Sequence, residues 1–232
     1  MQKAYISEVF SSMQGEGIFF GKKQIFVRFC GCNLSCAFCD TPSTYLTSRQ
    51  YGVSELIDEI HRLNMKEANC NSVSITGGEP LLQVEFLKEF LPSLKNGGFE
   101  VYLETNGTLF ENLNYVKDFV DIIAIDFKAP SSTRDASRWQ DHKLFLKAAY
   151  GKKYIFIKVV VTADTTPEDI RTVRELVCEI DSNIPVVLQP VTPVEDISRP
   201  DINTLGIFRD ILGQEISDVK IIPQVHKVLG IR

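Results

Sequence analysis

Cys32-Asn33-Leu34-Ser35-Cys36-Ala37-Phe38-Cys39 places three cysteines within eight residues, in the spacing C-x3-C-x2-C. The stretch follows the apolar run 24–29, which is rich in β-forming residues and predicts a strand that leads into this loop. A loop this short can hold three thiolates around one inorganic centre, because little chain has to be ordered. Three thiolates fill three iron sites of a four-iron, four-sulfur cluster and leave the fourth iron open. The spacing therefore predicts a cluster that can bind and reduce a further ligand.

Two alternatives to this assignment stay open at the level of sequence. A structural zinc site usually has two C-x2-C pairs or a mixture of Cys and His, and here the nearest histidine is His61. Cys30 extends the pattern to C-x-C-x3-C-x2-C and would allow a different set of three ligands. We expect Cys30 not to be a ligand, because it lies at the end of the predicted strand rather than in the loop.

Length and composition limit the classes of protein to consider. A chain of 232 residues suits one α/β domain, so we expect residues 1–232 to form a single domain. The net charge of −5, without a Lys/Arg-rich run, gives no support to nucleic-acid binding. No apolar run has the length of a membrane span, and the first residues lack the apolar stretch of a signal peptide. Four of the six cysteines gather in one loop, which suits a reducing interior and predicts a cytoplasmic protein.

Strand and helix patterns alternate along the chain. Strands are predicted at 5–10, 24–29, 72–76, 100–105, 122–126, 153–162, 186–189 and 219–222, and helices at 55–64, 81–95, 111–119, 137–149, 167–180 and 202–212. Residues 11–17 are expected to form a loop, Ser54 to cap the first helix, and Gly97 and Gly98 to end the second. Six or more βα units in succession imply a parallel sheet with right-handed crossovers.

Polar groups follow several of these strands. The segments are Thr76-Gly77-Gly78-Glu79-Pro80, Glu104-Thr105-Asn106-Gly107, Asp126-Phe127-Lys128 and Gln189-Pro190. Barrel enzymes carry their chemistry at the C-terminal ends of their strands. Glycine-containing turns are needed by any α/β protein, so the recurrence of charged and amide groups is the part of this pattern that indicates a site.

The cysteine spacing, with an aromatic residue directly before the third cysteine, resembles the radical S-adenosylmethionine superfamily. The resemblance implies a partial (β/α)6-type barrel, which we favour over an open doubly wound sheet, and a [4Fe-4S] cluster on Cys32, Cys36 and Cys39. It also implies that the open iron binds S-adenosylmethionine. The segment 77–80 resembles the superfamily's second motif, whose backbone binds the methionine amino group, since glycine lets a ligand approach. The cofactor contacts implied in this way are Phe38 near the adenine, Asp40, Gly78, Glu79, Asp126, Phe127, Lys128, Gln189 and Thr192.

A closer resemblance, to the 7-carboxy-7-deazaguanine synthase family, covers nearly the whole chain. It rests on Met13-Gln14-Gly15-Glu16-Gly17, Phe26-Val27-Arg28, Gly31-Cys32-Asn33-Leu34, Cys39-Asp40-Thr41 and Pro223-Gln224-Val225-His226-Lys227. The family converts 6-carboxy-5,6,7,8-tetrahydropterin to 7-carboxy-7-deazaguanine with loss of ammonia, in queuosine-type deazapurine biosynthesis. The resemblance implies Mg2+ and a homodimer, and we expect flavodoxin or ferredoxin as the electron donor. Phe38 stands where this family frequently has tryptophan, and Cys30 is atypical.

Several residue types suit this substrate chemically. The adjacent N–H groups of a pterin suit a carboxylate such as Glu16, and the 6-carboxylate suits the guanidinium fork of Arg28. Thr41 offers a hydroxyl to a hard cation such as Mg2+. Either charge by itself is equally compatible with a solvated surface, and the segment 40–42 with a plain turn. The implied substrate contacts are Met13, Gln14, Gly15, Glu16, Arg28, Thr76, His226 and the terminal carboxylate of Arg232.

Two rival functions share the cysteine spacing. An activase that places a glycyl radical on a partner protein would leave Glu16, Arg28 and Thr41 without a role. A non-enzymatic iron-sulfur or zinc protein would have no use for an open iron. Consumption of the pterin by the reconstituted protein distinguishes these functions.

Overall fold

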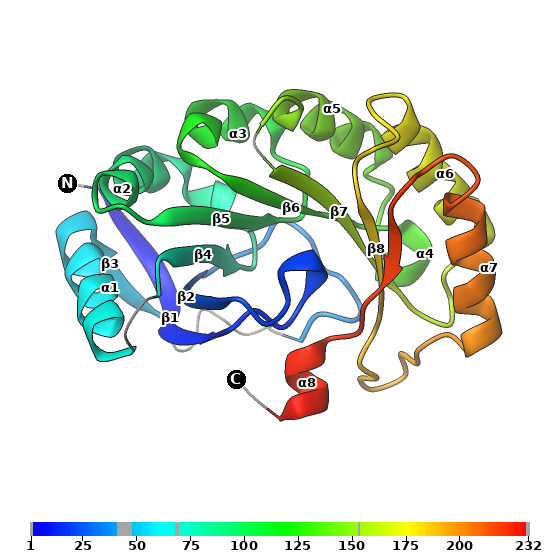
Figure 1. The fold of residues 1–232 in the computed structure, drawn as a ribbon, viewed down its shortest axis with the longest axis horizontal. Helices are drawn as coiled ribbons and strands as arrows, with labels where there is room; N and C mark the ends of the chain where they lie inside the picture. The colour runs from blue at the N-terminus through cyan, green and yellow to red at the C-terminus, as the bar shows by residue number, and fades with distance from the viewer. Residues whose placement is uncertain (1, 41–47, 68–69, 153, 231–232) are drawn as a thin grey trace.

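The computed structural model describes residues 2–40, 48–67, 70–152 and 154–230 (Figure 1). Its strands are β1 (Lys3–Met13), β2 (Lys23–Phe29), β3 (Arg49–Gly52), β4 (Ser72–Gly77), β5 (Glu100–Thr105), β6 (Ile122–Phe127), β7 (Tyr154–Val161), β8 (Val186–Pro190) and β9 (Val219–Ile221). They form one sheet in the order β3-β1-β2-β4-β5-β6-β7-β8-β9. Neighbours from β2 onward are parallel, whereas β1 is antiparallel to both β2 and β3.

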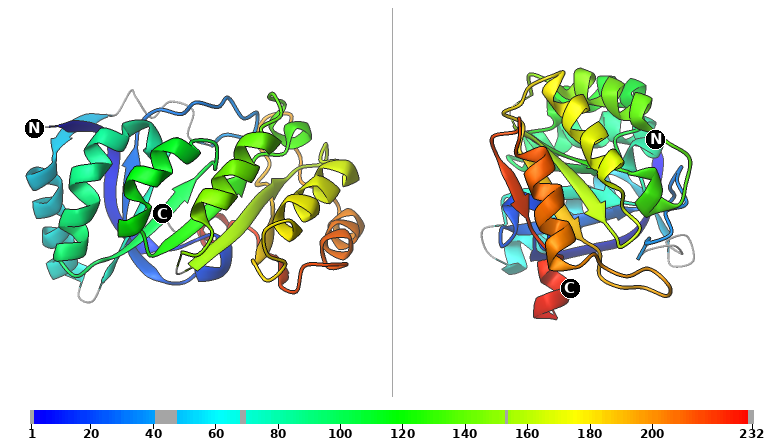
Figure 2. Two further views of the ribbon diagram at one scale, coloured as in Figure 1. Left: turned by 90° about the horizontal axis from the view of Figure 1, so that it is seen from above. Right: turned by 90° about the vertical axis from the view of Figure 1, so that its right-hand side faces the viewer.

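Helices connect successive parallel strands and cover one face of the curved sheet (Figures 1 and 2). They are α1 (Val53–Glu67), α2 (Val84–Asn96), α3 (Phe110–Val116), α5 (Trp139–Ala149), α6 (Pro167–Cys178) and α7 (Ile202–Leu212), with the short α4 (Pro130–Thr133). The short α8 (Val225–Leu229) follows the last strand, β9, and lies apart from this layer (Figure 1). Single 3-10 turns are η1 (Gly17–Phe19), η3 (Pro80–Gln83) and η4 (Lys117–Phe119). In the described ranges β3 and β9 are the two edges of the sheet and do not pair, so the barrel is partial, as expected. No helix in those ranges is both long and apolar enough to cross a bilayer.

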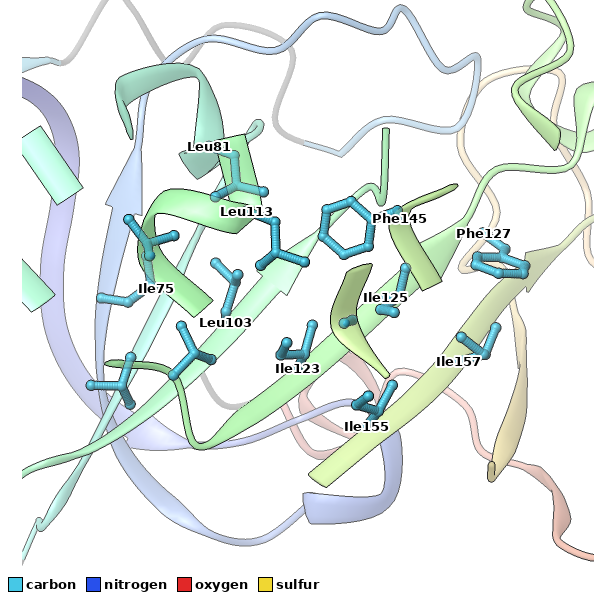
Figure 3. Packing of buried hydrophobic residues seen from close by; sticks show 14 of the residues in the cluster. Ile75, Leu81, Leu103, Leu113, Ile123, Ile125, Phe127, Phe145, Ile155 and Ile157 are labelled. Atoms are coloured by element: carbon cyan, nitrogen blue, oxygen red, sulfur yellow. The ribbon is translucent and has the colours of Figure 1, made fainter. Parts of the chain in front are cut away.

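The two faces of the central strands differ because successive side chains of a strand point to opposite sides. Outward residues such as Leu103, Ile123, Ile125 and Ile157 pack under the helices, together with Phe145 of α5 (Figure 3). The inward face carries a smaller apolar cluster: Tyr102, Ile122, Ala124, Phe156, Val187 and Ile222. The inward positions above this cluster are polar, and they face the cavity described below.

Side-chain caps fix where two of the crossover helices begin. Thr166 precedes α6, and its hydroxyl oxygen accepts the Asp169 N–H over 3.2 Å, with Pro167 at the first helical position. Asp201 precedes α7, and its carboxylate accepts the N–H groups of Asn203 and Thr204 over 2.8 and 3.0 Å. Both predicted helices are confirmed.

The structure corrects several expected boundaries. β1 continues to Met13, so the loop expected at 11–17 begins only after that residue. α1 begins at Val53, which places Ser54 inside the helix rather than at its cap. The short edge strand β3 and the short helices α4 and α8 were not predicted, because four or five residues carry too little periodicity. The helix expected from residue 81 starts as η3 and becomes α2 at Val84.

Candidate active site

A cavity of about 770 Å³ lies on the inward face of the sheet. Its walls are the cysteine loop, the glycine turn after β4, the inward side chains of β5–β8, the segment 13–17 and the segment 224–227. The parallel strands thus bring together residues that are far apart in the sequence, at the end of the sheet where barrel enzymes hold their sites.

The three cysteines of the spacing face this cavity. Cys32, Cys36 and Cys39 line it, whereas Cys30 is buried at the end of β2 and is not part of the lining. The loop is held from outside by the Ala37 N–H, which donates to Thr133 O over 2.8 Å. Burial raises the pKa of Cys36 to about 11, so its thiol is protonated until a metal displaces the proton.

The three thiols that line the cavity are the donor type that holds iron–sulfur clusters. Among the described residues, no three His, Cys, Asp or Glu side chains converge as ligands of one metal ion. In a four-iron cluster each thiolate binds a different iron, so the sulfur atoms stand further apart. Asn106 also reaches this loop, since its Nδ2 lies 3.8 Å from Cys32 Sγ.

The glycine turn after β4 packs directly on the base of the cysteine loop. A Cβ at Gly78 would lie 2.1 Å from Gly31 O, and Gly77 has a φ of +134° and equally little room. The Glu79 N–H donates to Gly31 O over 2.8 Å. Only glycine allows this approach, which leaves backbone groups of the turn at the cavity wall.

Two of the predicted cofactor contacts direct their side chains elsewhere. The buried Glu79 carboxylate accepts the N–H groups of Leu81 and Asn106 and the Thr105 hydroxyl over 2.7–2.9 Å, and burial raises its pKa to about 7. Phe127 points outward and stacks on His142 at 4.6 Å. Neither Glu79 nor Phe127 is part of the cavity lining.

A chain of charges crosses the cavity. Lys158 Nζ lies 2.5 Å from Glu16 Oε2 and 3.1 Å from Asp126 Oδ2, and Lys128 Nζ lies 2.9 Å from the same Asp126 oxygen. Burial alone would raise the pKa of Glu16, but Lys158 lowers it to about 2. Burial alone would lower the pKa of Lys158, but Asp126 and Glu16 raise it well above its ordinary value. Glu16 and Lys158 are therefore both charged at neutral pH.

Two residues of the cavity wall each have a buried acceptor oxygen without a hydrogen-bond partner in the described residues. These oxygens are Asp126 Oδ1 and Gln189 Oε1. Buried oxygens without partners are rare and indicate a missing donor. Phe38 lies beside them, with Lys128 Nζ 5.2 Å from its ring centre, and packs on the apolar cluster Val160, Val191 and Ile197. These acceptors suit the hydroxyl and amino donors of S-adenosylmethionine, and the aromatic ring suits its adenine.

Glu104 is a second carboxylate in the cavity. It accepts hydrogen bonds from Gln14 Nε2 at 2.8 Å, Ser74 Oγ at 3.1 Å and Thr76 Oγ1 at 3.0 Å. Gln14 is itself buried and also donates to Gln24 Oε1 over 3.1 Å. The predicted substrate contacts Gln14 and Thr76 therefore hold Glu104, and all three line the cavity.

The remaining predicted contacts lie around the rim. Arg28 lines the cavity, and its Nε lies 3.1 Å from Glu8 Oε2. Met13 also lines it and is half exposed, and the exposed Asp40 lies 3.5 Å from Lys227 Nζ. Thr192 donates to Gln224 Oε1 over 2.5 Å, and Gln224 Nε2 donates to Glu16 over 2.8 Å. Gly15 and His226 are in contact with each other, whereas Thr41 and Arg232 lie outside the described residues.

Sequence reasoning missed Lys158, Glu104 and Gln224 as members of the site. The sequence could have indicated Lys158, because it is the one charged residue of the otherwise apolar strand β7. Glu104 and Gln224 stand within motifs that were noticed, but their partners are set by the tertiary fold. No sequence pattern indicated the buried His142. Its Nε2 accepts the Lys128 N–H over 2.9 Å, and its Nδ1 lies 3.1 Å from Gly107 O.

Comparison with known proteins agrees with this arrangement. The model of the radical SAM superfamily matches residues 26–177, from β2 to the end of α6. The chain therefore belongs to the radical SAM superfamily, which implies a four-iron, four-sulfur cluster and S-adenosylmethionine. It is 35% identical to the 7-carboxy-7-deazaguanine synthase of Geobacter sulfurreducens, over 98% of this chain and 97% of that protein. A protein of the same name from Methanocaldococcus jannaschii is 32% identical, over 97% and 99%. Within the superfamily, the chain belongs to the 7-carboxy-7-deazaguanine synthase family.

A solved structure supports the fold independently. QueE from Escherichia coli superposes with a TM-score of 0.67, over 97% of this chain and 95% of that one, at 22% identity. The partial barrel expected from the sequence is confirmed.

Proposed function

We propose that this protein converts 6-carboxy-5,6,7,8-tetrahydropterin to 7-carboxy-7-deazaguanine with loss of ammonia. The observation that carries the proposal is one cavity lined by three cysteines, by two residues whose buried acceptors have no partner in the described residues, and by both carboxylates and cations. Two relatives that align over nearly the full length of the chain are named 7-carboxy-7-deazaguanine synthase. A cavity with these polar groups does not favour the activase alternative, which needs a surface for a peptide.

The cofactor side of the cavity is formed by the cysteine loop and the ends of β4, β6 and β8. Cys32, Cys36 and Cys39 would hold the cluster, which together with S-adenosylmethionine would supply the radical chemistry that acts at C6 of the pterin. The backbone of Gly77 and Gly78 is open to the methionine amino group. Asp126 Oδ1 and Gln189 Oε1 are placed to accept cofactor donors, and Phe38 offers its ring to the adenine.

The substrate side is formed by the segment 13–17, Arg28 and Glu104. Glu16 and Glu104 are the two carboxylates available to the N–H edge of a pterin, and Arg28 is the cation available to its 6-carboxylate. His226 and Gln224 close the cavity from the end of the chain. These side chains fix the ring orientation that presents C6 to the radical.

Further parts of the proposal concern partners and surroundings. Mg2+ would bind the substrate carboxylate with Thr41, and Arg232 would complete the site. Flavodoxin or ferredoxin would supply the electron, and the protein would work as a cytoplasmic homodimer whose residues 1–232 form a single domain. The single sheet that runs through the described residues supports the one-domain assignment.

The experiment supplies the reconstituted, anaerobic protein with reductant and with pterin deuterated at C6. The reaction involves no net redox change, so the abstracted hydrogen can return and S-adenosylmethionine can be reused. Mass spectrometry should find deuterium in S-adenosylmethionine and many products per 5′-deoxyadenosine. One 5′-deoxyadenosine per product would exclude this reuse. No product with an intact cluster would exclude the proposed reaction.

A further inference from the structure

We propose that Lys158 is a positioning residue for both ligands: its ammonium fixes Glu16 on the substrate side and Asp126 on the cofactor side. The inference deepens the proposed function and rests on it for the identity of the substrate. It assigns a role to a residue that neither the cysteine motif nor the glycine motif includes.

The sheet itself sets the position of Lys158. β6 and β7 are parallel neighbours, and Asp126 pairs in register with Lys158, so both side chains point inward at the same level. Glu16 approaches from the loop that follows β1. The side chains of Lys158, Asp126 and Glu16 are 13%, 14% and 19% exposed, so solvent screens their attraction only weakly.

In each of the two carboxylates, one oxygen forms an ion pair with the ammonium of Lys158. Asp126 Oδ2 receives Lys158 and Lys128, which leaves the buried Oδ1 without a partner in the described residues. Glu16 Oε2 receives Lys158, and its Oε1 receives Gln224 Nε2. Lys158 therefore determines how both carboxylates are oriented toward their ligands.

The surrounding charges show what its loss would do. The groups that face Glu16 and Lys158 are Tyr102 and Glu104 from β5, Asp126 from β6, Lys128 just after β6, and His226 from α8. Without Lys158, Asp126 would keep its ion pair with Lys128. Glu16 would lose its ammonium partner, while burial would continue to favour its neutral form. Glu16 is thus the carboxylate expected to take up a proton.

The test measures binding without turnover. Reconstituted protein is kept anaerobic and without reductant, and calorimetry gives Kd for S-adenosylmethionine and for the pterin at pH 8 and pH 6.5. Lys158→Gln should weaken both ligands at least about tenfold, because it leaves buried charges unpaired. The ratio of variant to unmodified Kd for the pterin should rise at pH 6.5, and using this ratio cancels the titration of the ligand itself.

Two further variants complete the design. Glu16→Gln/Lys158→Gln should bind both ligands weakly but lose the pH dependence of the ratio, and it replaces the single variant if that one fails to fold. Lys22→Gln is the matched control: Lys22 pairs with Glu100 outside the cavity lining, so both Kd values should stay within about twofold.

The outcomes separate the inference from the proposed function. Unmodified protein that binds S-adenosylmethionine but not the pterin would overturn the proposed function, and with it the substrate half of the inference. If unmodified protein binds both ligands and Lys158→Gln, or the double variant in its place, weakens only one or neither, the inference alone is overturned.

Discussion

The imidazole of His226 packs directly against Gly15: a Cβ built on Gly15 would lie 2.3 Å from Nδ1 and 2.6 Å from Cβ of His226. The same two segments share a backbone hydrogen bond of 2.8 Å from the Val225 N–H to Gly15 O. Gln224 adds its 2.8 Å bond to Glu16. The loop after β1 and the end of the chain thus form one wall of the cavity.

Replacing Gly15 with alanine should therefore displace His226 and α8. We expect stability to fall by about 1–3 kcal/mol from overpacking and pterin binding to weaken about tenfold. Adding His226→Gly to Gly15→Ala should recover part of the lost stability, since it removes both the ring and the Cβ that clash. Gly206→Ala is the control, because a Cβ there meets nothing within 4 Å. Thermal melts and calorimetry measure both effects, and a Gly15→Ala protein with normal stability and binding would contradict this contact.

The cysteines should divide into three ligands and one core residue. Cys32→Ala, Cys36→Ala and Cys39→Ala should each abolish the visible absorption of the reconstituted cluster, because each removes the thiolate of one iron. Cys30→Ala should retain it, since Cys30 is buried outside the cavity lining. Iron content per chain is the measurement, and loss of iron in Cys30→Ala with retention in Cys32→Ala would reverse the assignment.

His142 should make stability depend on pH in a defined direction. Burial lowers its pKa to about 4, from an ordinary 6.5. Between these values the unfolded chain binds more protons, so the contribution of His142 to stability is present above pH 6.5 and is lost as pH falls to about 4. The full contribution is about 3 kcal/mol.

His142→Phe tests this linkage while retaining a ring to stack on Phe127. The variant should lose about 1–3 kcal/mol at pH 7, because the Lys128 N–H and Gly107 O lose their partner. It should also lose less stability than the parent between pH 6.5 and pH 4. Urea midpoints of cluster-free protein at several pH values provide the comparison, with the exposed His61→Phe as control. Parallel pH curves for parent and variant would rule out this role.

Glu104→Gln should affect both binding and folding. The carboxylate accepts three hydrogen bonds, and a glutamine would turn its NH2 group toward donors. We expect a loss of about 1–3 kcal/mol and weaker pterin binding. Glu100→Gln on the same strand provides the control, because Glu100 is more exposed, at 37%, and lies outside the cavity. Equal effects of the two substitutions would show that Glu104 has no special place in the site.

The sequence predicted local structure better than contacts between residues that are far apart in the chain. β5 was predicted with its observed bounds, and the three cysteines that line the cavity were separated from Cys30, because both predictions depend on patterns within a few residues. The contact of Gln224 with Glu16 joins positions that are 208 residues apart, and no periodicity encodes it. The sequence also did not indicate that the Glu79 carboxylate binds Leu81, Thr105 and Asn106, since a turn sequence does not reveal which way a side chain points.

The alternation along β5–β8 also affects how a chain of this kind can diverge. Positions 104, 124, 156 and 160 border the cavity, while their immediate neighbours 103, 125, 157 and 159 belong to the apolar layer under the helices. Mutations that change ligand preference and mutations that change helix packing therefore fall on different, interleaved positions. A descendant gene can explore new substrates through the first set while inheriting an unaltered scaffold through the second.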